Sequence, residues 1–157
     1  MDSYRPGRFL RISNRFVAPL VRIGLPMGAR RAPMALLTVA GRRSGQPRTA
    51  PVAVAPTPDG WTLIAAFGPT DWAKNLEAAG EAVITMRRKA VPVAARRLAP
   101  GEAAPVLRDS VASAPRIVQR MTSRYFDVDA DAPLEAWERE TVRHPVFALT
   151  VRRTERV

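Results

Sequence analysis

The chain has 157 residues, no cysteine and one histidine, which suits one domain and excludes a disulfide framework, a thiolate nucleophile and a Cys/His metal site. Its net charge of +11 is uneven, because residues 1–48 hold ten arginines against one acid while the remaining 109 residues are nearly balanced. A localised positive field of this kind suits a nucleic acid, an anionic membrane surface or a phosphorylated small molecule.

Residues 8–25 form the first predicted element, a basic amphipathic helix. At about 100° per residue the apolar side chains share one side, and Arg8, Arg11, Arg15 and Arg22 gather opposite them. The apolar face either caps the core, lies on an anionic membrane surface or forms part of a lid. No apolar run reaches the 18–20 residues, roughly, that span a bilayer, and the N-terminus lacks the apolar region of a secretory signal. We expect a cytoplasmic protein, with peripheral membrane contact through this helix as an alternative.

Three strands are predicted next, because three short apolar runs are bounded by turn residues. They cover residues 34–40, 49–55 and 61–67. Strands joined by loops this short pair antiparallel.

The loop between the first two strands is the candidate anion site. It reads Gly-Arg-Arg-Ser-Gly-Gln-Pro-Arg over residues 41–48. Glycine lets backbone N–H groups approach an anion closely, and each guanidinium offers a fork of donors that matches phosphate oxygens. The alternative is a polar, solvent-exposed turn with no ligand.

A helix is predicted over residues 71–79, with Thr70 or Asp71 as its N-cap and Gly80 just past its end. Asn75 falls on the same face as the apolar side chains of this helix. An asparagine in that position needs a hydrogen-bond partner, either backbone or ligand.

The rest of the chain alternates between strands and helices. A basic turn at residues 87–89 is expected to be a solvated hairpin tip. The predicted elements are strands at 81–87, 90–98 and 144–151, a helical stretch at 100–125 that breaks near 113–115, and a helix at 133–142 capped by Asp131 or Ala132. Six or more mostly antiparallel strands interspersed with helices predict an α+β, mainly β fold: a small barrel with helical covers, as one domain over residues 1–157.

No side-chain set for catalysis emerges. Glu135, Glu138 and Glu140 are expected to face solvent on a charged helix, and His144 has no nearby serine or cysteine, so we expect it to be structural. We predict no metal site. Exposed aromatic platforms between basic residues are missing, which argues against nucleic acid. A barrel with an anion-binding loop and no catalytic set is expected where a cofactor does the chemistry.

Two motifs resemble those of the deazaflavin-dependent nitroreductase family. One is the basic loop 41–48 with Pro51 after it, and the other is the Asp-Trp-Ala-Lys-Asn-Leu run at residues 71–76. The resemblance covers about residues 36–98. It implies a split β-barrel of the FMN-binding type, an antiparallel barrel of six to seven strands, and coenzyme F420, a 5-deazaflavin, as cofactor. FMN is the alternative cofactor.

The resemblance also implies a set of site residues. Those expected to hold the phosphate and acidic tail of the cofactor are Arg42, Arg43, Ser44, Gly45 and Arg48. Those expected near the deazaflavin rings are Pro51, Val52, Ala66, Phe67, Gly68, Trp72 and Asn75. Many members place Ser-Lys-Gly where this chain has Ala-Phe-Gly, so one cationic contact is absent. Tyr125 is the sole candidate for the substrate-facing tyrosines of the family.

The implied reaction is transfer of hydride from the reduced deazaflavin to a small electrophilic acceptor, an enone, quinone or nitro-compound. The partner is therefore a small-molecule substrate, and the chain is expected to be a monomer or a homodimer. The alternative keeps the barrel and makes it a non-enzymatic protein that binds a cofactor, a flavin, haem or a lipid.

Overall fold

The computed structural model describes residues 28–29 and 32–153, and the helix predicted at residues 8–25 lies outside them. The strands are β1 (Gly28–Ala29), β2 (Ala32–Ala40), β3 (Pro47–Thr57), β4 (Gly60–Ile64), β5 (Glu81–Met86), β6 (Lys89–Arg97) and β7 (Val146–Val151). The helices are α2 (Asp71–Ala79), α3 (Pro100–Ser113), α4 (Arg116–Thr122) and α5 (Leu134–Glu140), with a 3-10 turn η1 (Ser123–Tyr125).

Six strands close into a barrel. Its order is β2-β3-β4-β7-β6-β5, and β2 also pairs with β5, so no edge between them is left open. Every pairing is antiparallel. Leu37 illustrates the closure, since it lies opposite Ala50 on one side and Ile84 on the other. The fold is a split β-barrel, which confirms the predicted fold class.

The barrel interior is filled by alternate residues of the strands, as the two-residue period of a strand requires. On β2, the side chains of Ala35, Leu37 and Val39 are buried in the barrel core, together with Val52 and Val54 of β3. Helix α2 packs against β2, β3, β5 and β6 and covers this part of the barrel. Gly80 ends α2 in the left-handed conformation, with φ of 67°, as predicted.

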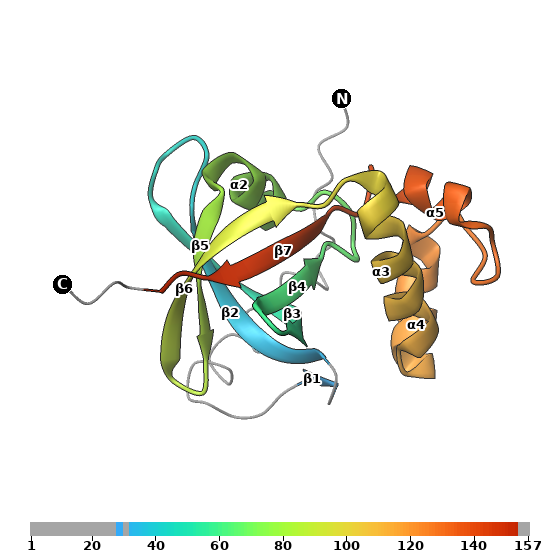
Figure 1. Cartoon of the computed structure of the whole chain (residues 1–157), viewed down its shortest axis with the longest axis horizontal. Helices are drawn as coiled ribbons and strands as arrows, with labels where there is room; N and C mark the ends of the chain where they lie inside the picture. The colour runs from blue at the N-terminus through green and yellow to red at the C-terminus, as the bar shows by residue number, and fades with distance from the viewer. Residues whose placement is uncertain (1–27, 30–31, 154–157) are drawn as a thin grey trace.

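Helices α3, α4 and α5 gather on one side of the barrel (Figure 1). A second core joins α3 and α5 to the start of β7, with Leu107, Trp137 and Val146 at its centre. Glu140 corrects a prediction, because its side chain is buried against this layer and does not face solvent. It lies on the inner side of α5, where Arg143 donates a hydrogen bond to its carboxylate.

Several boundaries differ from those predicted. The strand expected at 61–67 ends at Ile64, because Gly68 takes a positive φ of 94° and donates its N–H to the Ala65 carbonyl, closing a turn. The last strand begins at Val146 and leaves His144 in the preceding turn. The helix expected at 133–142 is shorter and has Pro133 at its N-cap.

The basic turn between β5 and β6 is a two-residue hairpin connection. Arg87 and Arg88 both adopt positive φ, of 47° and 65°, as the mirror-image turn of a tight hairpin requires. Both residues are exposed, in agreement with a solvated tip. Within the described residues, no helix is long and apolar enough to cross a membrane.

Candidate functional site

The basic loop joins β2 to β3 as a short, internally bonded turn. Gly41 donates its N–H to the Gln46 carbonyl, and Gly45 donates to the Gly41 carbonyl, both over 2.8 Å. Gly45 has a φ of 68°, which side chains other than glycine rarely adopt. A Cβ on Gly41 would come within 2.9 Å of the Ser44 hydroxyl oxygen. The two glycines therefore allow the tight turn in which Arg42 and Arg43 lie between them.

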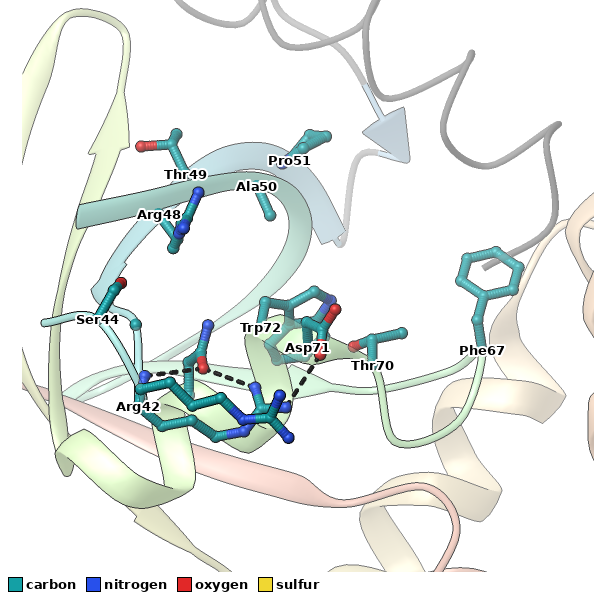
Figure 2. A pocket seen from close by; sticks show the side chains of 13 residues that line it. Arg42, Ser44, Arg48, Thr49, Ala50, Pro51, Phe67, Thr70, Asp71 and Trp72 are labelled. Atoms are coloured by element: carbon teal, nitrogen blue, oxygen red, sulfur yellow. Dashed lines mark hydrogen bonds and ion pairs between the residues drawn. The ribbon is translucent and has the colours of Figure 1, made fainter. Parts of the chain in front are cut away.

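Arg42 fastens this loop to helix α2. Its backbone N–H donates to Asn75 Oδ1 over 3.1 Å, and its guanidinium Nη1 donates to the same oxygen over 2.8 Å. Its Nη2 reaches Asp71 Oδ1 over 3.2 Å. Asn75 is only 6% exposed, and a buried asparagine needs a hydrogen-bond partner. Arg42 of the loop is that partner. The dashed lines in Figure 2 mark these bonds.

The loop and α2 border a cavity of about 520 Å³, within the range of small-molecule sites. We call it the loop–α2 cavity. Its walls are the loop, the start of β3, the turn after β4 and the first turns of α2 (Figure 2). The lining residues are Gly41, Arg42, Arg43, Ser44, Arg48, Thr49, Ala50, Pro51, Phe67, Thr70, Asp71, Trp72 and Asn75.

The charged side chains that line this cavity are mostly positive, and only one of the positive ones has an ion-pair partner in the described part of the chain. Arg42 is paired with Asp71, the one acid of the lining. Arg43 and Arg48 make no ion pair or side-chain hydrogen bond with the described part of the chain. The Thr70 hydroxyl oxygen is buried and likewise lacks a partner there. Within the described part of the chain, two unpaired guanidinium groups therefore line a cavity suited to an anionic ligand, and the buried Thr70 hydroxyl has no partner.

The opposite part of the lining is apolar. Pro51, Phe67 and Trp72 contribute rings there, from β3, the turn after β4 and α2. A flat aromatic ligand with an anionic end would find matching surfaces at both ends of the cavity.

Eight of the twelve residues that the sequence pointed to line this cavity, and they come from two parts of the chain, residues 42–51 and 67–75. They are Arg42, Arg43, Ser44, Arg48, Pro51, Phe67, Trp72 and Asn75. Four lie outside the lining for local reasons. Val52 points into the barrel core, Gly45 is at the exposed loop tip, and Ala66 and Gly68 shape the turn that carries Phe67.

Five further lining residues were not anticipated as site residues: Gly41, Thr49, Ala50, Thr70 and Asp71. Asp71 had a usable signal, because it lies one helical turn before Asn75 and so presents a second acceptor on the same side of α2. Thr49 and Ala50 had none, since only barrel closure brings the start of β3 over α2.

Tyr125 and His144 lie behind the cavity wall. The Tyr125 ring meets the Phe67 ring edge-on, with centroids 5.3 Å apart, and does not line the cavity. His144 is buried and stacks on Phe126, and its ring nitrogens contact the backbone carbonyls of Ala65 (3.0 Å) and Tyr125 (2.7 Å). These contacts tie η1 to the turn after β4, in agreement with a structural role for His144.

Comparison with known proteins gives a family and a fold. A family model described as F420H(2)-dependent quinone reductase matches residues 11–133. A structure described as a domain-swapped dimer has 18% identity and a TM-score of 0.52, covering 93% of this chain and 99% of its own. This likeness shows a shared fold. No curated protein sequence matches the chain significantly.

Two more structures are similar at a lower level. The F420-H2 dependent reductase FDR-A has 20% identity and a TM-score of 0.41, with 77% of this chain and 94% of the other covered. HutZ, a heme storage protein from Vibrio cholerae, has 11% identity and a TM-score of 0.48, with 77% and 82% covered.

Proposed function

The chain belongs to the F420H(2)-dependent quinone reductase family, and on that premise we propose that it is a reductase that takes coenzyme F420 into the loop–α2 cavity. The observation that carries the proposal is the pair Arg43 and Arg48, two guanidinium groups that line the cavity without a partner in the described part of the chain. Such groups are what an anionic tail requires.

The residues present fit the two chemically different parts of this cofactor. Arg43, Arg48 and Ser44 suit the phosphate-bearing tail. Phe67 and its apolar neighbours suit the faces of a flat ring. Arg42 has a different task in this scheme: it holds the loop against α2, so that Arg43 and Arg48 are presented from a fixed turn.

When bound, the reduced coenzyme supplies a hydride for two-electron reduction of an electrophilic acceptor such as a quinone, enone or nitro-compound. The chain contributes binding, orientation and exclusion of water. Among the described lining residues, the neutral proton donors are the hydroxyls of Ser44, Thr49 and Thr70. A proton for the product therefore comes from one of these hydroxyls or from water.

The first test is binding. The intrinsic fluorescence of coenzyme F420 is titrated with the full chain at low and at moderate salt. Replacing Arg43 or Arg48 by Ala should weaken binding about tenfold or more each, because a charge-assisted hydrogen bond contributes about 1.5–3 kcal/mol. The matched control is Arg87→Ala with Arg88→Ala, which removes two exposed charges far from the cavity lining. If the control variant weakened coenzyme binding as much as the site variants, the loop would contribute only non-specific electrostatic attraction.

A variant of opposite sign sharpens this test. Asp71→Asn removes the one carboxylate of the described lining and leaves the Arg42 guanidinium bonded to Asn75. It should tighten binding of the polyanionic coenzyme, by up to about fivefold, since the Asp71 side chain is 79% exposed and its charge is screened. Weaker binding by this variant would contradict the assignment of the anion to this end of the cavity.

The second test is turnover. Reduced coenzyme is mixed with a quinone, an enone and a nitro-compound, and its oxidation is followed with and without the protein. Catalysed oxidation with any of the three supports the reductase. Tight binding of the coenzyme without turnover of any acceptor favours the non-enzymatic binding protein instead.

A further inference from the structure

Helix α4 exposes apolar side chains on one face. Ile117 is 69% exposed and Met121 is 40% exposed, and the two lie one turn apart on the same side of the helix. A single exposed apolar residue is ordinary, whereas two large ones stacked on a short helix form a contiguous patch.

Basic side chains border that patch. Arg116 and Arg120 are also one turn apart, and at about 100° per residue they fall directly beside Ile117 and Met121. Both arginines are exposed and make no ion pair with the described part of the chain. Arg124 follows in η1, with its guanidinium 5.8 Å from the centre of the neighbouring tyrosine ring. These five residues together are the α4 surface.

The opposite side of α4 is held to the protein. The Gln119 side-chain amide donates hydrogen bonds to the carbonyls of Ala112 (3.4 Å) and Ala114 (2.8 Å), at the end of α3. Gln119 lies nearly half a turn from Ile117 and Met121 around the helix axis. These anchors therefore turn the α4 surface away from the end of α3.

We propose that the α4 surface docks onto an anionic lipid bilayer. An apolar pair flanked by arginines is the pattern of a helix that lies in the membrane interface, where its apolar side chains enter the acyl boundary and its cations meet acidic headgroups. A second copy of this chain is a poorer occupant, since each copy carries a charge of +11. Nucleic acid would use the arginines and leave the apolar pair in water.

The residue that follows the α4 surface in the chain contacts the lining of the loop–α2 cavity. Tyr125, which ends η1 directly after α4, packs edge-on against Phe67 of the cavity lining.

The experiment uses vesicles and needs no cofactor, so its outcome is separate from that of the proposed function. Because the chain has no cysteine, Met121→Cys gives a single labelling site for an environment-sensitive dye. The labelled full chain is mixed with vesicles containing phosphatidylglycerol and with neutral phosphatidylcholine vesicles. We expect a blue shift with the acidic vesicles alone. The control label is at Val142→Cys, a site that is more open in the protein, at 68% exposure against 40% for Met121.

Sedimentation with acidic vesicles then measures the energetics in unlabelled protein. Arg116→Ser with Arg120→Ser should lower vesicle partitioning about 25-fold, from about fivefold per basic residue near an anionic surface. The double change Arg87→Ser with Arg88→Ser removes the same charge from the β5–β6 turn and should have little effect.

Ile117→Ser with Met121→Ser should also release the protein from acidic vesicles, whereas Val142→Ser should not. If neither α4 double variant changed partitioning onto acidic vesicles, the proposal would be overturned, and another part of the chain would bind the membrane. A dye shift that rises with protein concentration in the absence of vesicles would also overturn it, in favour of a second copy of this chain.

Discussion

Asn75 offers the sharpest test of how the basic loop is held. Its amide oxygen accepts two hydrogen bonds from Arg42, one from the backbone and one from the guanidinium, at 3.1 and 2.8 Å. Asn75→Leu keeps a similar side-chain volume and removes both acceptor contacts. The backbone N–H of Arg42 is then left without its partner, and the guanidinium keeps only Asp71.

The expected loss follows from these two bonds. A neutral hydrogen bond contributes about 1 kcal/mol net and one to a charged group about 1.5–3 kcal/mol. The Arg42 side chain is 28% exposed and regains part of its bonding from water, so we expect Asn75→Leu to cost about 1–3 kcal/mol. For a chain of this size that lowers the midpoint of thermal unfolding by about 2–12 °C.

Asn75→Asp separates stability from ligand binding. Its carboxylate keeps both acceptor contacts with Arg42, so the unfolding midpoint should stay close to that of the unaltered protein. It also places a second negative charge in the cavity lining, beside Asp71, and should weaken binding of an anion.

The assay is therefore paired: thermal unfolding followed by circular dichroism, and titration of coenzyme F420 by fluorescence. Asn75→Leu should lose stability and affinity together, whereas Asn75→Asp should lose affinity alone. Unchanged stability and affinity in Asn75→Leu would refute the conclusion that Asn75 holds the loop.

Two further predictions concern the barrel and α3. Gly60→Ala would place a Cβ 2.1 Å from the backbone carbonyl oxygen of Leu149 in β7, so it should destabilise by at least about 3 kcal/mol. Gly45→Ala also meets a positive φ but has no atom within 4 Å, and should cost only about 1–2 kcal/mol in the same thermal unfolding experiment. The Arg96 guanidinium, bonded to Glu102 over 2.9 Å, holds the pKa of that carboxyl below its ordinary value. Arg96→Met should raise the pKa of Glu102 in an NMR titration. The stabilising contribution of this pair is present near neutral pH and is lost as the pH falls through the folded-state pKa of Glu102, because the protonated carboxyl no longer attracts the guanidinium. An unchanged pKa in Arg96→Met would count against the pairing.

The replacement at position 67 changes one wall of the cavity. The resemblance implies a lysine in many members, and this chain has Phe67, whose ring lines the cavity and packs on Tyr125. One end of the cavity is therefore cationic and the other aromatic. This separation agrees with the division of labour proposed above, in which arginines hold an anionic tail and rings face the acceptor side.

Local sequence patterns were sufficient for most of the elements. Alternating or continuous apolar runs between turn residues predicted six strands of the barrel, and helix α2 has its predicted bounds, Asp71–Ala79, with Gly80 just past its end. These signals work because strand periodicity, caps and turn conformations depend on neighbouring residues. The prediction extended the third strand too far, because Gly68 takes a positive φ and its N–H bonds the Ala65 carbonyl, which closes a turn directly after Ile64.

The sequence by itself determined that an arginine-rich turn stands between two strands and that Asn75 needs a partner on an apolar helix face. Only the tertiary structure decided that the partner is Arg42, that Asp71 shares it, and that Arg43 and Arg48 line the cavity without an ion pair in the described part of the chain. The tertiary structure also decided that the Glu140 side chain is buried. The reason is physical: hydrogen bonds between residues more than thirty positions apart depend on barrel closure, which brings the β2–β3 loop over α2 and leaves no trace in local periodicity.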